Sequence, residues 1–357
     1  MSPGPSLNFS DIASYIRRCD TSLECLDEFP LVSWSTGSAA SLAHICSYVA
    51  AQRGRDLNVL LPGYFCGQSL RYLRSLDVNI IFYPLTHDLS PDFSYLEKKF
   101  MTQRADIFVL VHYFGRITSQ EKSQRLAVRY GALLVEDCAH VISPAVADTW
   151  CGDYLMFSPH KFFPVPPMGL LISKQPVVTT PRSARHFPLI WIIKNLVKTF
   201  VKYRRSAAPS RCQSGQSETV PQRVPHRSVI KAVINCMHKL EQVSRTRQQN
   251  IQRLLEAIRT VSGWEVALDP EESKSLYLLP VKCETTAIAK NRYRLLNQTE
   301  QIVMYWPDLP FEIKRDRMIE QQCLILREHT LFFMVHHRMN LERVTRIILS
   351  STYKDLV

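Results

Sequence analysis

The feature that most constrains the fold is an alternation of short apolar runs and amphipathic helical segments between about residues 31 and 173. Buried strands that are joined by helices form βαβ units, in which helices cover a parallel sheet. The sequence therefore predicts an α/β domain with a mainly parallel mixed sheet flanked by helices. The expected strands are 58–62, 78–85, 106–114, 132–135 and 154–157, and the expected helices are 38–52, 68–75, 93–100 and 120–130.

The remaining chain predicts a second, smaller domain. Apolar residues recur at helical spacing over 229–258, and the last hundred residues alternate between strand-like and helical patterns. A length of 357 residues also suggests two domains. We expect a large domain at 1–180, a basic helix and flexible insert at 181–228, a linking helix at 229–265 and a small α+β domain at 266–357. Within these last regions we expect strands at 277–281, 301–305 and 331–336, and helices at 312–327 and 341–349.

The formal net charge of +12 is concentrated in one segment. Residues 182–239 contain twelve Lys or Arg side chains and one acid, Glu218, which is a surplus of eleven (12 − 1), so the rest of the chain is almost neutral. No nucleic-acid-binding motif accompanies this charge. We therefore expect no nucleic-acid partner.

Within the basic segment, residues 189–203 place apolar side chains at helical spacing with lysines at 194, 198 and 202. We expect this helix to pack on its own protein, with its lysines in solvent. The alternative is a basic amphipathic helix at 187–205 that lies on an anionic membrane surface. The apolar stretch at 187–201 is too short to span a membrane.

Compartment and metal content are predicted from simpler patterns. The N-terminus shows no signal-peptide pattern, so we expect a cytoplasmic protein. The ten cysteines include no CxxC pair, and the histidines at 112, 336 and 337 are too isolated to predict ligands. We expect reduced thiols and no metal site.

Three short motifs fall where an α/β fold builds ligand sites. Gly37-Ser38-Ala39 precedes a helix, where free backbone amides and the helix dipole favour a phosphate. Asp137, in the run Asp137-Cys-Ala-His140, follows a predicted strand, and Ser158-Pro-His-Lys161 follows the next one. The carboxyl ends of parallel strands are where such sheets bind ligands.

These residue types are the ones that pyridoxal phosphate (PLP) needs. A lysine forms a Schiff base with its aldehyde, and a carboxylate keeps its pyridine nitrogen protonated, so that the ring draws electrons. An anion site holds the phosphate, and an aromatic or imidazole ring stacks on the pyridine. Taken singly, each motif is an ordinary cap, turn or surface lysine, so the prediction depends on their order along the chain.

The same motifs resemble those of the DegT–StrS family of PLP-dependent sugar aminotransferases. Its phosphate motif resembles Gly37–Ala40, its "EDxAxx" motif resembles Glu136–His140, and its "GDxxxFS…K" motif resembles Gly152–Lys161. The segment Val111–Gly115 is also similar to the family's "VHxYG". This resemblance implies the aspartate-aminotransferase-like fold (fold type I) and a homodimer with the active site at the interface.

The resemblance also assigns roles to single residues. It implies that Lys161 carries the cofactor, that Asp137 meets the pyridine nitrogen and that His140 lies against the ring. It implies a phosphate site that includes Ser38, Ala39 and Ser158. The loop that contains Tyr64 and Phe65 matches the family's ring-stacking position, and both residues remain candidates.

The implied activity is the transfer of an amino group from glutamate or glutamine to a keto group, in a sugar attached to a nucleotide or in a related biosynthetic intermediate. Three departures from the family leave alternatives open. The serine-to-lysine spacing is three instead of five, the residues after the lysine are Pro164–Gly169 instead of a glycine-rich stretch, and the asparagine-containing element is not located. The alternatives are another PLP chemistry on this fold, such as elimination, decarboxylation or carbon–carbon bond formation, and a non-catalytic or membrane-associated scaffold with a vestigial site.

Overall fold

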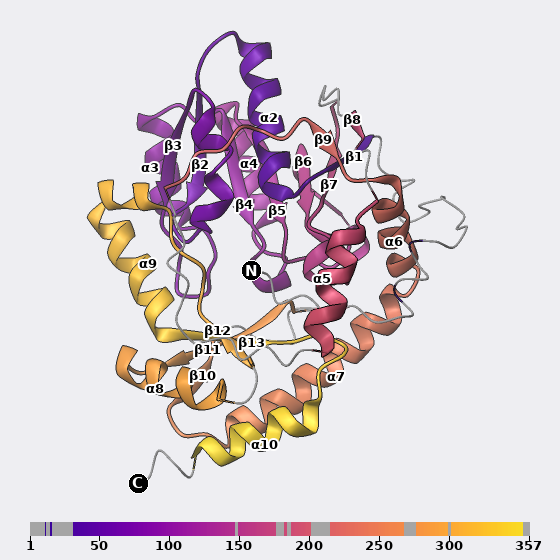
Figure 1. Ribbon diagram of the computed structural model, residues 1–357. Helices are drawn as coiled ribbons and strands as arrows, with labels where there is room; N and C mark the ends of the chain where they lie inside the picture. The colour runs from indigo at the N-terminus through magenta and orange to yellow at the C-terminus, as the bar shows by residue number, and fades with distance from the viewer. Residues whose placement is uncertain are drawn as a thin grey trace.

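The computed structural model describes residues 11, 15, 31–146, 149–175, 182–183, 187–200, 215–267, 276–298 and 301–352. Its largest element is a seven-stranded sheet in the order β1-β7-β6-β5-β4-β2-β3 (Figure 1). The strands β3, β2, β4, β5 and β6 are parallel to one another, whereas β7 runs antiparallel between β6 and β1. The predicted fold class is confirmed. The strands are β1 (Leu31–Ser35), β2 (Leu57–Pro62), β3 (Val78–Tyr83), β4 (Ile107–Val111), β5 (Leu133–Cys138), β6 (Tyr154–Phe157) and β7 (Gly169–Ser173).

Helices cover this sheet and connect its parallel strands: α2 (Ser38–Arg53), α3 (Phe93–Thr102) and α4 (Gln120–Tyr130). The alanine-rich helix α2 contacts β1, β2, β6 and β7, and its small side chains allow a close approach to the sheet. It ends at Gly54, whose φ of 62° is the left-handed conformation that glycine accepts at a helix C-terminus. All five side chains of β4 are buried, as expected for a central parallel strand.

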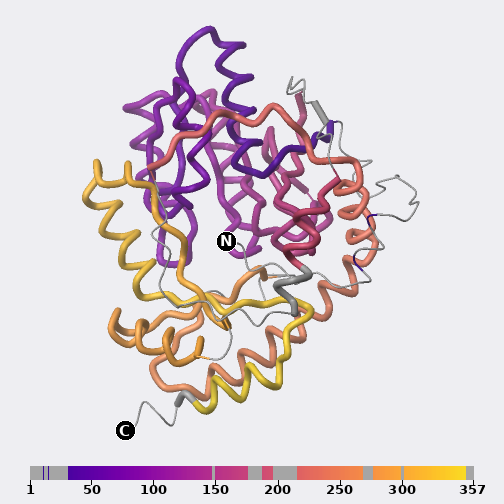
Figure 2. Tube along the Cα trace, viewed as in Figure 1, coloured from indigo at the N-terminus to yellow at the C-terminus, as the bar shows by residue number. Residues whose placement is uncertain are grey.

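The second sheet is antiparallel, in the order β10-β11-β13-β12, and it belongs to the C-terminal part of the chain. Figures 1 and 2 show this orange-to-yellow part at one end of the large sheet, with α7 and α10 packed against each other along its outer edge. Its elements are β10 (Trp264–Val266), β11 (Leu278–Cys283), α8 (Thr286–Leu296), β12 (Val303–Met304), α9 (Arg317–His329), β13 (Thr330–Met334) and α10 (Leu341–Thr352), preceded by α6 (Arg227–Met237) and α7 (Leu240–Arg259).

Three predicted helices differ in the structure. The segment 68–75 forms two 3-10 turns, Gly67–Leu70 and Leu73–Ser75, and Gly67 is bound through its N–H to Asp308 O (2.7 Å). The predicted helix at 229–258 is divided between α6 and α7, because Lys239 has a non-helical backbone (φ −103°, ψ 12°). The helix predicted at 312–327 begins only after Asp316, which caps α9 by accepting from Met318 N and Ile319 N.

The basic segment is described in part. Helix α5 (Leu189–Phe200) forms as predicted, whereas residues 201–214 lie outside the described residues. Two short parallel strands, β8 (Arg182–Ser183) and β9 (Arg223–Val224), bracket this segment. None of the described helices combines the length and the apolar character needed to cross a membrane.

Candidate active site

Asp137 lies near the carboxyl end of β5, in the middle of the large sheet. It pairs with Val111 of β4 and with Met156 of β6. The sequence predicted a strand that ends at residue 135, but β5 continues through Glu136, Asp137 and Cys138. The side chain of Asp137 is buried, and its Oδ1 accepts a hydrogen bond from Ala139 N (2.9 Å). Among the described residues, none donates to its other oxygen, Oδ2.

Lys161 ends a 3-10 turn, Pro159–Lys161, that directly follows β6. Its backbone N–H donates to Ser158 O (3.0 Å), and its Nζ lies 5.5 Å from the centre of the Tyr277 ring. Burial lowers the pKa of Lys161, and the nearby Asp137 carboxylate opposes this shift. Burial likewise raises the pKa of Asp137, and Lys161 opposes that shift. The two charges therefore act on each other within one buried site.

Two serines that are far apart in the sequence meet at the start of α2. The Oγ of the buried Ser158 donates to Ser38 Oγ (3.0 Å). Ser38 is the first residue of α2, so the backbone N–H groups of Ser38 and Ala39 have no acceptor within the helix. Two hydroxyls beside a helix N-terminus make a site for an anion such as a phosphate.

A close backbone contact holds this helix terminus in place. Gly169 begins β7 and pairs with Ser35, directly under the turn at Gly37. A Cβ at Gly169 would lie 2.5 Å from Ser35 Oγ and 2.7 Å from Gly37 C. Because such distances are shorter than any ordinary contact, only glycine allows the Gly37 turn to come this close to the sheet.

His140 lies between two aromatic rings. It stacks on Phe114 (centroid distance 5.6 Å, interplanar angle 12°) and on Tyr277 (4.9 Å, 22°). Its Nδ1 accepts a hydrogen bond from Phe114 N (3.2 Å). Burial, with Lys161 nearby, lowers the pKa of His140 well below its ordinary value. The imidazole is therefore neutral, with its proton on Nε2.

Glu136 points away from Asp137 and stabilises the loop that leads into β6. Its Oε2 lies 2.7 Å from His112 Nε2 and accepts from Gln120 Nε2 (2.9 Å), and its Oε1 accepts from Cys151 N (2.9 Å). Burial acts to raise the pKa of Glu136, but these hydrogen bonds outweigh it and keep the pKa below its ordinary value. His112 is therefore part of a buried hydrogen-bond network with Glu136. No cluster of metal-ligating side chains occurs among the described residues.

Tyr64 and Phe65, the two candidates for the ring-stacking position, are both buried. The Tyr64 ring stacks on Trp306 of the C-terminal domain (4.8 Å, 20°) and lies 5.9 Å from the Tyr113 ring. The ring that Lys161 Nζ contacts is instead that of Tyr277, which precedes β11. Sequence reasoning did not find Tyr277 or Trp306, because no local motif marks a residue that reaches the site from another domain.

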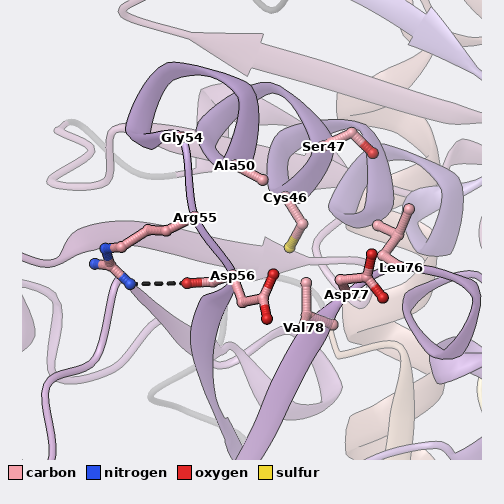
Figure 3. A pocket seen from close by; sticks show the side chains of 9 residues that line it. All are labelled: Cys46, Ser47, Ala50, Gly54, Arg55, Asp56, Leu76, Asp77 and Val78. Atoms are coloured by element: carbon pink, nitrogen blue, oxygen red, sulfur yellow. Dashed lines mark hydrogen bonds between the residues drawn. The ribbon is translucent and has the colours of Figure 1, made fainter.

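Two surface hollows lie away from these residues. One of about 420 Å³ is shown in Figure 3, at the C-terminal end of α2 and the amino ends of β2 and β3. It is lined by residues that include Cys46, Arg55 and Asp77. This is the opposite edge of the sheet from Asp137 and Lys161, and the amino ends of parallel strands are not where such folds bind their ligands.

Comparisons with known proteins agree with the motifs. Residues 78–171 match the model of the DegT/DnrJ/EryC1/StrS aminotransferase family, a segment that contains β3 to β6, Asp137 and Lys161. No curated protein matches the chain in sequence. The resemblance predicted from the motifs is confirmed, and with it the prediction of a PLP-dependent enzyme.

Solved structures share the fold at low sequence identity. Helicobacter pylori PseC, an aminotransferase involved in the biosynthesis of pseudoaminic acid, superposes with a TM-score of 0.70 at 11% identity, over 98% of both chains. Bacillus subtilis NtdA, solved with bound cofactor PMP, has a TM-score of 0.67 at 11% identity, over 97% of this chain and 83% of its own. DesI, solved in the presence of its TDP-sugar product, has a TM-score of 0.67 at 14% identity, over 98% of this chain and 85% of its own.

Proposed function

We propose that the protein transfers an amino group from glutamate or glutamine to the keto group of a sugar, in a form attached to a nucleotide or in a related biosynthetic intermediate. The observation that carries this proposal is the meeting of three groups at the carboxyl edge of one parallel sheet: Asp137, Lys161 and the Ser38–Ser158 pair. This edge is where α/β folds bind their ligands.

The described residues fit PLP. Asp137 has one oxygen without a hydrogen bond from a described residue, and this oxygen would accept from the pyridine nitrogen. The amides of Ser38 and Ala39 and the hydroxyls of Ser38 and Ser158 would bind the phosphate. Lys161 Nζ would bond to the aldehyde carbon. Because Phe114 and Tyr277 cover both faces of His140, this side chain would meet the cofactor through its edge, with its Nε2–H as a donor.

The chemistry divides between the cofactor and these side chains. When bound, PLP supplies an electron-withdrawing ring that stabilises negative charge on the carbon that loses a proton. Lys161, whose pKa is lowered by burial, is suited to accept and return that proton as a neutral amine. Asp137 would keep the ring nitrogen protonated through its charge. The aromatic cluster of Phe114, Tyr277 and Trp306 would exclude water from the site.

The substrate class rests on the relatives. The family whose model matches is an aminotransferase family, and the similar structure of DesI was solved in the presence of its TDP-sugar product. Glutamate and glutamine are proposed as donors from the motif resemblance alone. A homodimer with the site at its interface, a cytoplasmic location and the domain bounds given above remain predictions of the same kind.

A half-reaction tests the proposal. The purified protein loaded with PLP is mixed with L-glutamate or L-glutamine, and the absorbance change from the PLP to the pyridoxamine form is followed. Wild-type protein and a Lys174→Ala variant, which alters an exposed lysine, should convert, and Lys161→Ala should not. If PLP binds but no amino acid converts it, the aminotransferase proposal is wrong, and the other PLP chemistries of this fold take its place.

A further inference from the structure

Helix α5 leaves a group of large apolar side chains in solvent. Leu189 is 55% exposed, Ile190 is 70% exposed and Ile193 is 50% exposed, and the preceding Phe187 is 40% exposed. Leu189, Ile190 and Ile193 fall within five positions of one helix and form an apolar patch on it. Met318, Leu324 and Ile325 are a second exposed group, on α9, whereas Met101 and Val128 lie singly on α3 and α4. A patch of this kind marks an interaction surface.

The other side of α5 is fixed to the protein. Ile192 is buried and Trp191 packs against the core. The start of the helix is held by Phe187, whose ring makes edge contacts with Tyr15 (6.4 Å) and with His226 (6.1 Å), the N-cap residue of α6. The apolar patch is therefore presented to solvent on a helix that is anchored along its opposite side.

Lysine borders this patch. On a helix of 3.6 residues per turn, residues 189, 190 and 193 lie within about 100° of one another around the helix axis. The exposed Lys194 lies about 40° further around the axis than Ile190. In the sequence, lysines recur at 198 and 202, at the four-residue spacing typical of one side of a helix. An apolar stripe beside a lysine row is the pattern of a helix that lies in a membrane interface.

We propose that α5 docks on the surface of an anionic lipid bilayer, with Leu189, Ile190 and Ile193 among the upper acyl chains and Lys194 at the phosphates. Charge complementarity favours lipid over a second copy of this chain. Residues 182–239 carry a surplus of eleven positive charges (12 − 1), which would repel the same segment of another molecule but attract anionic headgroups. The inner side of the helix packs on its own protein, as expected from the sequence, and the proposal concerns its exposed side.

The test is sedimentation of the full chain with vesicles. Vesicles of phosphatidylcholine mixed with phosphatidylglycerol should carry the protein down, and vesicles of phosphatidylcholine alone should carry much less. A Lys194→Gln variant should bind about fivefold more weakly, since one lysine near such a surface contributes about 1 kcal/mol. Raising the salt from about 0.1 M to about 1 M should also weaken binding, because it shortens the Debye length from about 10 Å to about 3 Å.

Matched variants distinguish vesicle binding through this patch from nonspecific adsorption through other exposed apolar side chains. The double variant Ile190→Ser/Ile193→Ser should lose at least about tenfold in vesicle binding, with an unchanged melting temperature because both side chains are exposed. The controls Met101→Ser/Val128→Ser and Lys290→Gln alter equally exposed side chains elsewhere and should bind like wild type.

Three results would overturn the proposal. The first is no binding to anionic vesicles, and the second is equal binding by wild type and the Ile190→Ser/Ile193→Ser variant. In the third, the double variant changes the oligomeric state measured by light scattering and leaves vesicle binding intact, which would assign the patch to a second copy of the chain.

Discussion

Asp137 is buried, but its proposed role requires a negative charge. Burial raises its pKa and favours the neutral acid, yet the role proposed for it requires a negative charge. Lys161, the amide of Ala139 and His112 all act to lower that pKa, and a protonated pyridine nitrogen at Oδ2 would act in the same direction. In the proposed site, cofactor binding would itself help to keep Asp137 ionised.

An Asp137→Asn variant tests this role. Asparagine keeps the shape and removes the charge, so the ring nitrogen would lose its proton. We expect PLP to remain bound through Ser38, Ser158 and Lys161, and the rate of the half-reaction with glutamate to fall by about 10²–10³-fold, as when a key electrostatic partner is removed. Stopped-flow absorbance measures this rate. Equal rates for the variant and the wild type would show that Asp137 has another role.

The residues of the site differ in how visible they are in the sequence. Asp137, Ser158 and Lys161 could be predicted because each lies at or just after the carboxyl end of a strand, and this position identifies ligand-binding residues in an α/β fold. Tyr277 and Trp306 could not, because they reach the site from the other domain through tertiary packing. Gly169 carried no signal either, since its need for glycine depends on the approach of the Gly37 turn.

Among the secondary-structure elements, the contact between β7 and α2 determines the geometry of the proposed phosphate site. A Gly169→Ala variant would place a Cβ 2.5 Å from Ser35 Oγ and 2.7 Å from Gly37 C, and so would move the N-terminus of α2 away from Ser158. We expect PLP affinity to fall by about tenfold, the equivalent of about 1.4 kcal/mol of strain. Equilibrium titration of the apo-protein with PLP measures it.

The control for that variant is Gly215→Ala, where the added Cβ meets only ordinary contacts with Phe311, at 3.4 Å or more. It should bind PLP as wild type does. If Gly169→Ala also binds PLP normally, the phosphate site does not depend on the start of α2.

Another element-scale contact joins α2 and β2 to the amino end of β4. The buried carboxylate of Asp106 pairs with Arg53 and Arg55 and accepts from Asn58 N (2.9 Å). Although burial acts to raise its pKa, these partners together lower it below the ordinary 3.8. Its contribution to stability is therefore full above pH 3.8 and is lost as the pH falls through the lowered value.

An Asp106→Asn variant should be less stable by about 2 kcal/mol at neutral pH, because two arginines lose their partner but remain partly hydrated. Its stability should also fall less steeply in acid than that of wild type. Urea unfolding at pH 7 and at pH 3 to 4 measures both effects. An Asp77→Asn control changes an exposed carboxylate and should match wild type; a steep acid dependence that persists in Asp106→Asn would contradict the account.

Element boundaries were harder to predict than element types. The segments that became α2, α3 and α4 were found almost to the residue, because α2 is apolar along most of its length and because α3 and α4 show the helical spacing of an amphipathic helix. The segments 68–75 and 229–258 were misjudged at points where tertiary contacts or a single non-helical residue interrupt an otherwise helical pattern. The antiparallel strands β1 and β7 were not predicted, since their pairing joins residues far apart in the chain.

For the whole molecule, the alternation of strands and helices in the sequence predicted the fold class. It did not predict how the C-terminal sheet is placed relative to the large sheet. The C-terminal sheet meets the site through Trp306 and Tyr277, a junction of aromatic rings that no local pattern reveals.

The proposed homodimer is a prediction about the whole molecule. Size-exclusion chromatography with light scattering should give twice the chain mass of 41.2 kDa at micromolar concentration, and a strict monomer would contradict it.

The central claim is that Lys161 is the residue that holds PLP. The protein is incubated with PLP, treated with borohydride and digested, and the peptides are analysed by mass spectrometry. The account predicts a phosphopyridoxyl group on Lys161, with no labelling of the Lys161→Ala variant and normal labelling of the Lys174→Ala control. An unlabelled wild-type protein, or a label on a different lysine, would contradict it.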